Sequence, residues 1–183
     1  NAFDPTVIAT YPTAAALLSE QARIGTLVAR PREVWTGGET LSTAVRHHIQ
    51  ENLACTVRNN YGTSEFLTIG WECHLGKMHV NDDWIILEPV DEQWQAVAPG
   101  TESTTTLLTN LANHTQPLIR YDIGDRILVE PNPCSCGSAL PVINVKGRDD
   151  DSLSMAGEKK GSLVTVLPLA LMTALEEDAA VFD

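Results

Sequence analysis

Apolar and polar positions follow an alternating strand and helix pattern over the first 70 residues. Three short β-type runs cover residues 6–9, 32–35 and 54–58. Between them lie a segment of helical period at 12–22 and a second segment with apolar residues at helical spacing: Leu41, Val45, Ile49 and Leu53. Strands that alternate with helices predict parallel βαβ units, in which ligand sites lie at the carboxyl ends of the strands.

The pattern changes after Trp71, where the helical period disappears. Short β-rich runs separated by turn residues follow at 79–80, 84–87, 104–109, 127–129 and 142–145. This spacing predicts a small, largely antiparallel sheet or barrel. The charged, glycine-containing residues 147–161 predict a linker and a turn, which precede a predicted strand from Leu163 and a predicted helix at 168–177.

These elements predict an α/β chain in three parts. Residues 3–70 are expected to form a βαβ part of a larger domain, 71–146 a small β domain, and 147–183 the truncated start of an α+β domain. We interpret the first two residues as left by an expression tag, because no methionine precedes them. The apolar run at 163–175 lacks partner elements, which predicts either a homodimer or a mobile end.

Charge and composition exclude two classes of partner. The 183 residues include 12 Lys and Arg against 24 Asp and Glu, a formal net charge of -12, so the overall field repels nucleic acid. No apolar run reaches the roughly 20 residues that span a bilayer, which predicts a soluble protein without a membrane partner. Four cysteines are too few for a disulfide framework in a chain of this length and indicate a reducing cytoplasm.

The segment from Asn60 to Glu65 gathers several ligand-binding groups at one corner between a strand and a loop. It reads Asn-Tyr-Gly-Thr-Ser-Glu. The aromatic ring suits a planar base, the hydroxyls suit a phosphate, and the carboxylate suits Mg²⁺. Taken alone, the segment favours a plainer interpretation, a loop with a core tyrosine and a surface glutamate.

Three further segments change that interpretation because they stand in the order found in adenylate-forming enzymes. They are Thr-Gly-Gly-Glu-Thr-Leu at 36–41, Pro-Leu-Ile-Arg-Tyr-Asp-Ile-Gly-Asp at 117–125 and Val-Lys-Gly-Arg-Asp-Asp-Asp at 145–151. Pro-Cys-Ser-Cys-Gly at 133–137 precedes the last of them. From residue 5 to about 178, the chain therefore resembles the adenylate-forming, acyl-CoA synthetase-like superfamily and, within it, the phenylacetate-CoA ligase branch.

The resemblance implies which residues bind the base of ATP or AMP. Tyr61 is expected to stack on adenine, and Asn60 to reach its amino group. The remaining residues implied around the base are Gly37, Gly38, Glu39 and Gly62.

The resemblance also implies the phosphate, ribose and hinge residues. Ser64 is expected to contact the α-phosphate and Glu65 to coordinate Mg²⁺. Asp125 is expected to accept both ribose hydroxyls, which suits a carboxylate with two acceptor oxygens. Arg148 is expected to donate to the ribose, and Asp150 to be the hinge about which the C-terminal domain rotates.

The activity that the resemblance implies is an acid-thiol ligase, which converts a carboxylic acid and ATP to an acyl-adenylate and then to a thioester with coenzyme A. The family's phosphate loop and catalytic lysine have no match here, and Lys159 and Lys160 lie too close to the hinge, so the chain alone is predicted to be inactive. Asp122 and Ile123 stand where relatives commonly have arginine and threonine, and Ser64 replaces the more common threonine. The sequence does not identify the acid.

Two other functions fit the same residues. One is an adenylating enzyme that passes the acyl group to a different acceptor, such as an amine, or stops at the adenylate. The other is a non-catalytic, zinc-stapled binding module whose nucleotide motifs are relics.

Four candidate metal ligands form a second site: Cys73, His79, Cys134 and Cys136. A Cys-x₅-His pair and a Cys-x-Cys pair suit a tetrahedral, structural Zn²⁺. His74 is the alternate ligand, and Cys55, on a predicted core strand, is expected to pack. The competing interpretation is that these cysteines are buried as small hydrophobes.

Overall fold

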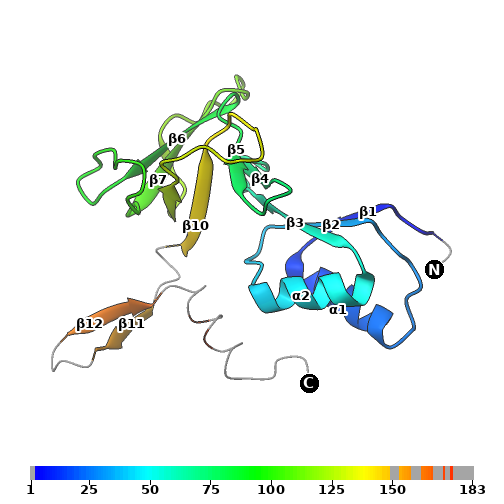
Figure 1. The fold of residues 1–183 in the computed structure, drawn as a ribbon. Helices are drawn as coiled ribbons and strands as arrows, with labels where there is room; N and C mark the ends of the chain where they lie inside the picture. The colour runs from blue at the N-terminus through cyan, green and yellow to red at the C-terminus, as the bar shows by residue number, and fades with distance from the viewer. Residues whose placement is uncertain (1–2, 149–152, 158–161, 167–170, 172–173, 175–183) are drawn as a thin grey trace. The chain divides into compact units, whose positions relative to one another are not determined.

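The computed structural model describes residues 3–148, 153–157, 162–166, 171 and 174 (Figure 1). Internal contacts divide the chain into two compact units, Asn1–Met78 and His79–Asp183. The predicted hinge residue Asp150 and most of the predicted helix at 168–177 lie outside the described residues.

The first unit confirms the predicted βαβ organisation. Its elements are β1 (Val7–Thr10), α1 (Pro12–Arg23), β2 (Glu33–Gly37), α2 (Thr43–Leu53), β3 (Thr56–Tyr61) and β4 (Gly70–Glu72). Strands β1, β2 and β3 are parallel and lie in that order, and β4 pairs with β3 in the antiparallel direction. The carboxyl ends of three strands therefore meet at one edge of this sheet.

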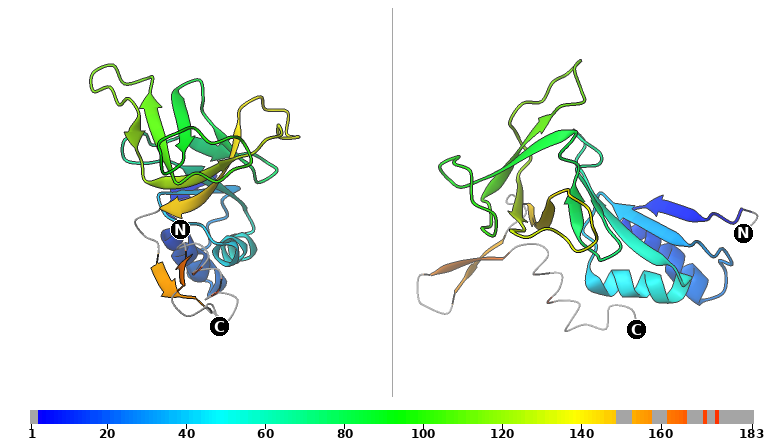
Figure 2. Two further views of the ribbon diagram at one scale, coloured as in Figure 1. Left: turned by 90° about the vertical axis from the view of Figure 1, so that its left-hand side faces the viewer. Right: turned by 45° about the horizontal axis from the view of Figure 1, so that its top comes forward.

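Both helices of the first unit pack on one face of its sheet, as Figures 1 and 2 show. The buried side chains that join helices and strands are Ala15, Val34, Ile49, Leu53 and Val57. Helix α2 begins at a serine cap, because the Ser42 hydroxyl accepts the Val45 amide at 3.2 Å. It ends at Ala54, whose φ of 50° turns the chain into β3.

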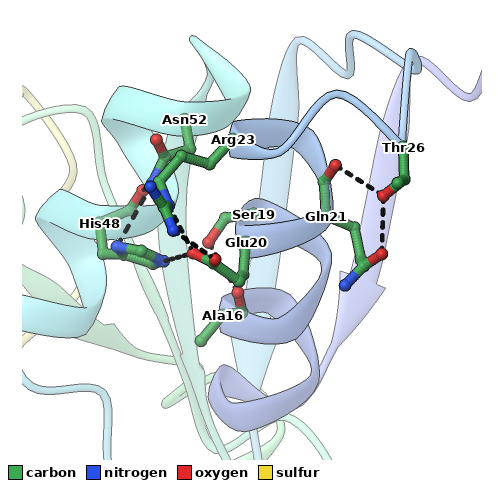
Figure 3. Close-up of polar contacts among 8 residues, drawn as sticks. All are labelled: Ala16, Ser19, Glu20, Gln21, Arg23, Thr26, His48 and Asn52. Atoms are coloured by element: carbon green, nitrogen blue, oxygen red, sulfur yellow. Dashed lines mark hydrogen bonds and ion pairs between the residues drawn. The ribbon is translucent and has the colours of Figure 1, made fainter. Parts of the chain in front are cut away.

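Polar contacts also join α1 to α2 (Figure 3). The Glu20 carboxylate accepts from Arg23 Nε at 2.8 Å and from Nη2 at 2.7 Å, and His48 Nε2 of α2 lies 3.9 Å from Glu20 Oε2. The pKa of the Glu20 carboxyl is held below its ordinary value, first by the hydrogen bond from Arg23 and further by the nearby positive charge. These exposed contacts contribute little to stability beside the apolar core.

The described part of the second unit consists mainly of β-strands and the loops between them. Its strands are β5 (Met78–Val80), which begins at the boundary between the units, β6 (Ile85–Val90), β7 (Thr105–Asn110), β8 (Tyr121–Asp122), β9 (Asp125–Val129), β10 (Val142–Arg148), β11 (Leu153–Ala156) and β12 (Leu163–Val166). The strand orders are β5-β10-β9, β6-β7-β8 and β11-β12. The pairs β9 with β10, β6 with β7, β7 with β8, and β11 with β12 are antiparallel.

The prediction of a linker and turn at residues 147–161 was incomplete. Strand β10 continues to Arg148, and Leu153–Ala156 form β11, paired with β12. All four residues of β11 are exposed, so no buried apolar period marked this strand in the sequence. No helix in the described part of the chain is long and apolar enough to cross a membrane.

Candidate functional site

The Gly-Gly-Glu turn at the end of β2 is held against the start of α1. Gly38 has a φ of 78°, which favours glycine, and a Cβ atom there would lie 2.8 Å from Tyr11 Cε1 and push the exposed ring away. Glu39 Oε2 accepts the Thr13 amide at 3.2 Å and the Thr13 hydroxyl at 2.8 Å. The Glu39 side chain thus caps the first turn of α1, while its backbone stays at the predicted base site.

Four of the residues predicted around the base meet at the end of β3. Gly37 pairs with Asn60, and a Cβ atom on Gly37 would lie 2.9 Å from the Asn60 carbonyl oxygen. Asn60 Nδ2 donates to the Leu67 carbonyl at 3.2 Å. A Cβ atom on Gly62 would lie 2.0 Å from that same carbonyl oxygen, and half-buried Tyr61 ends the strand. The glycines of these motifs are therefore required by close approach of the backbone.

Ser64 and Glu65 lie at the exposed tip of the loop that follows. The loop is closed by Thr63 and Phe66, whose amides donate to each other's carbonyls at 3.0 and 3.2 Å. Both side chains are thus accessible to a phosphate or a cation. Their predicted roles toward the α-phosphate and Mg²⁺ stay predictions.

A pocket of about 710 Å³ lies on the first unit beside this corner. It is lined by Ala9, Thr10, Tyr11, Trp35, Thr36, Gly37, Asn60, Thr68 and Trp71. From the sequence alone, the two tryptophans are expected at core or rim positions, and the structure places them in the lining of this pocket. The available signal is strand geometry, because Trp35 lies two positions before Gly37 on β2, and Trp71 pairs with Asn60.

In the second unit, the two residues predicted at the ribose face each other. Asp125 begins β9, Arg148 ends β10, and the two pair in the ladder with Asp125 Oδ1 and Arg148 Nη1 3.9 Å apart. Asp125 is buried, and its carbonyl accepts the Thr106 hydroxyl at 2.8 Å. Arg148 Nη1 donates to the Ile123 carbonyl at 3.2 Å. The chain thus places a fixed carboxylate next to a half-exposed guanidinium.

The residues that depart from the common family pattern shape the turn before Asp125. Asp122 Oδ1 accepts the Gly124 amide at 3.0 Å and also the Thr105 hydroxyl. Ile123 is buried, and its amide donates to the Thr106 carbonyl at 3.1 Å. Asp122 therefore uses its carboxylate to stabilise the turn.

The four predicted metal ligands come together. One ligand atom from each of Cys73, His79, Cys134 and Cys136 lies within 4.8 Å of the others, and all the cysteines are free thiols. Among the described residues this is the one such group of three or more potential ligands. His74, the alternate ligand, is exposed and lies outside the group.

Hydrogen bonds orient two of these ligands. His79 is fully buried, and its Nδ1 lies 3.0 Å from the Leu140 carbonyl oxygen, which fixes Nδ1 as the donor. Its Nε2 is thereby the candidate ligand nitrogen, and it lies 3.3 Å from Cys136 Sγ. The Ser138 amide approaches the same sulfur at 3.4 Å. A carbonyl that orients the imidazole and an amide near the sulfur are typical of the groups around metal ligands.

Known proteins are similar in sequence to this chain over most of its length, although no family model matches it. The chain is 29% identical to a phenylacetate-coenzyme A ligase of Thermus thermophilus over 165 residues, which are 85% of the chain and 37% of the relative. It is 27% identical to Protein CapK of Staphylococcus aureus over 154 residues, 81% of the chain and 31% of that protein. The chain thus spans about a third of the length of these curated relatives.

The fold agrees with the sequence relatives. A 2-hydroxyisobutyryl-CoA ligase superposes with a TM-score of 0.79 at 24% identity, over 94% of the chain and 37% of that protein. An anthranilate CoA ligase superposes with a TM-score of 0.67 at 18% identity, over 96% of the chain and 35% of that protein. The sequence similarity to a phenylacetate-coenzyme A ligase therefore confirms the resemblance that the motifs indicate, and the solved CoA ligases confirm the fold.

Proposed function

We propose that this chain supplies the base and ribose side of the nucleotide site in an ATP-dependent carboxylate-CoA ligase. Two observations support this proposal most. In the first unit, motif residues lie at the ends of β2 and β3. In the second, Asp125 and Arg148 face each other. The identity of 29% with a phenylacetate-coenzyme A ligase supports it. So does a structural neighbour, the 2-hydroxyisobutyryl-CoA ligase, whose complex contains 2-HIB-AMP and CoA.

In the proposed reaction, a carboxylate oxygen attacks the α-phosphorus of ATP and pyrophosphate leaves. The thiolate of coenzyme A then attacks the acyl carbon, which forms the thioester and releases AMP. Tyr61 and Asn60 hold adenine, while the two oxygens of Asp125 accept the ribose hydroxyls beside the guanidinium of Arg148.

The exposed loop after β3 serves the phosphates in this proposal. The Ser64 hydroxyl contacts the α-phosphate. Glu65 offers the hard oxygen ligand that Mg²⁺ prefers, and its exposed position leaves room for phosphate oxygens. When bound, Mg²⁺ neutralises charge on the phosphates as they separate.

The whole reaction is assigned to a protein of the relatives' length. The chain covers 37% and 31% of these two relatives. Its sequence has no segment that resembles the family's phosphate loop or catalytic lysine. We therefore propose that the chain alone binds nucleotide without activating the acid. The assignment of residues 3–70, 71–146 and 147–183 to separate domains, with the hinge at Asp150, is part of this proposal.

Calorimetric titration of AMP into the chain tests the binding step. We expect heat of binding, and about tenfold weaker affinity in Asp125→Asn, because the loss of a hydrogen bond to a charged group costs about 1.5 kcal/mol or more. Asp83→Asn, at an exposed position of the loop before β6, is the matched control and should bind normally. Absence of heat with the unaltered chain contradicts the proposal.

Pyrophosphate release distinguishes the rival functions. A protein of the relatives' length that contains this chain should release pyrophosphate only with a suitable carboxylic acid, and should consume coenzyme A in equal amount. Release without consumption of coenzyme A identifies an adenylating enzyme with another acceptor. No release with a broad panel of acids, together with no binding of AMP, identifies the binding module.

We also propose that Cys73, His79, Cys134 and Cys136 bind a structural Zn²⁺. Support comes from four ligand atoms within 4.8 Å and from the orientation of His79 by the Leu140 carbonyl. Three sulfurs and one nitrogen complete a tetrahedron without an open position, so the ion would be structural. Free thiols suit the reducing cytoplasm that we propose for this protein.

Metal analysis of the purified chain tests this site. We expect one zinc per chain, lost in Cys136→Ser and retained in Cys55→Ser, because Cys55 lies outside the cluster. Substitution with Co²⁺ should give the absorption bands of a tetrahedral thiolate site. Substoichiometric zinc that is equal in both variants would rule the site out.

A further inference from the structure

An ion pair with a buried carboxylate lies beside the end of β3. Glu72 of β4 is 8% exposed, and its Oε1 accepts Arg46 Nη2 of α2 at 2.8 Å. Its Oε2 accepts the backbone amide of Asn59 at 2.8 Å. Arg46 also donates from Nη1 to the Val57 carbonyl at 2.9 Å. One carboxylate therefore joins α2, β3 and β4.

The position of this contact relative to the β3–β4 ladder gives it a specific effect. The ladder has two pairs, Asn60 with Trp71 and Tyr61 with Gly70. Asn59 lies immediately before the first pair, and its amide donates to a side chain instead of a ladder carbonyl. The carboxylate of Glu72 thus fixes the backbone at the point where β3 leaves the helix-covered part of the sheet and enters the predicted base site.

Asn59 is also held from the neighbouring strand β2. The Thr36 hydroxyl lies 3.2 Å from both Asn59 Oδ1 and the Arg58 carbonyl oxygen. Thr36 is buried, as is the Glu72 carboxylate, so these bonds are protected from water. A buried charge is tolerated only when it is paired and fully hydrogen-bonded, and here each oxygen of Glu72 has a short partner.

We propose that Glu72 and Arg46 are positioning residues for the nucleotide site. They hold the backbone of Asn59 so that the next two residues, Asn60 and Tyr61, meet the base in a fixed direction. The inference rests on the proposed function, in which Asn60 and Tyr61 bind adenine. Glu72 and Arg46 act only through the backbone of β3 and do not touch the nucleotide.

Titration of AMP into the 183-residue protein tests this role. We expect Glu72→Gln and Arg46→Met each to weaken AMP binding about tenfold, equivalent to about 1.4 kcal/mol. Because both act through one contact, the double variant should bind about as well as either single variant. The double variant also leaves no unpaired buried charge, so it keeps the test open if a single variant does not fold.

Glu33→Gln is the matched control. It removes an ion pair between β2 and β3, in which Arg58 Nε lies 3.5 Å from Glu33 Oε1, whereas the Asn59 amide donates to Glu72. Glu33 Oε2 also accepts Trp35 Nε1 at 2.8 Å, and the side-chain oxygen of glutamine can keep that hydrogen bond. We expect its affinity for AMP to stay within about twofold of the unaltered protein, below the 1.4 kcal/mol of a tenfold change. Equal losses in Glu33→Gln and Glu72→Gln would show a general effect of charge or stability and overturn the positioning role.

Amide hydrogen exchange separates this inference from the proposed function. In Glu72→Gln, the amides of Asn59 and Tyr61 should exchange faster, while those of the β1–β2 pair should not change. If the unaltered protein does not bind AMP, the proposed function fails. The exchange rates then still show whether Glu72 tethers the Asn59 amide. Unchanged exchange at both amides contradicts the tether whatever the affinity for AMP.

Discussion

At the residue scale, Gly62 has the sharpest steric requirement in the base site. A Cβ atom there would lie 2.0 Å from the Leu67 carbonyl oxygen, within the backbone of the loop that carries Glu65. Gly62→Ala must therefore displace that loop, and we expect a loss of about 1–3 kcal/mol in the free energy of unfolding. Urea denaturation measures it.

Gly25→Ala is the control for Gly62→Ala. Gly25 has a φ of 79° but no atom within 4 Å of the added Cβ, so only backbone strain applies, about 1 kcal/mol. It should leave AMP binding unchanged, whereas Gly62→Ala should weaken it. Equal effects of the two substitutions on AMP binding would contradict the close approach at Gly62.

Cys55 should react more slowly in the folded chain than in the unfolded chain. Burial raises the pKa of its thiol, so less thiolate is present at neutral pH and alkylation by iodoacetamide is slow. Because the pKa of Cys55 is raised in the folded state, its protonated thiol contributes to the free energy of unfolding. That contribution is complete below the ordinary thiol pKa and is lost as the pH rises through the raised value. Mass spectrometry across the alkaline range measures the alkylation rate of Cys55, with the urea-unfolded chain as control. Equal alkylation rates in the folded and unfolded chain would contradict it.

At the element scale, periodicity predicted the strands and helices of the first unit to within a few residues, because the buried side chains that face α1 and α2 repeat regularly. It missed β4, β8 and β11, which have three, two and four residues and are too short or too exposed to show a buried apolar period. The motifs predicted a set of site residues, of which Gly37, Asn60 and Gly62 lie together at the end of β3, and their roles stay predictions. Strand spacing alone could not predict that Asp125 and Arg148 pair, because the register of β9 and β10 shifts between Val145 and Gly147.

The Glu39 cap of α1 gives a prediction at this scale. Helix α1 has no acidic residue in its first turn and no side-chain cap from Tyr11, so Glu39 supplies the negative charge from outside the helix. Glu39→Gln should lower the free energy of unfolding by about 1 kcal/mol, and less in a Thr13→Val background. Glu51→Gln, exposed on α2, is the matched control, and an equal loss there would contradict the cap.

At the scale of the whole molecule, two of the candidate metal ligands and the ribose pair occupy opposite ends of one hairpin. Cys134 and Cys136 lie in the loop that joins β9 to β10, and Asp125 and Arg148 are paired at the other end of the two strands. A bound metal would fix the loop and therefore limit slippage at the bulge near Gly147. The metal would then support nucleotide binding without contacting the nucleotide.

Removal of the metal should thus weaken AMP binding as well as lower the melting temperature. We expect chelation to reduce the affinity for AMP several-fold, about 1 kcal/mol, and added Zn²⁺ to restore it. Cys134→Ser should reproduce the loss and be insensitive to chelator, while Cys55→Ser should behave as the unaltered chain. A lower melting temperature with unchanged affinity for AMP would mean that the metal stabilises the loop alone, because the Asp125 end of the hairpin would then keep its register without it.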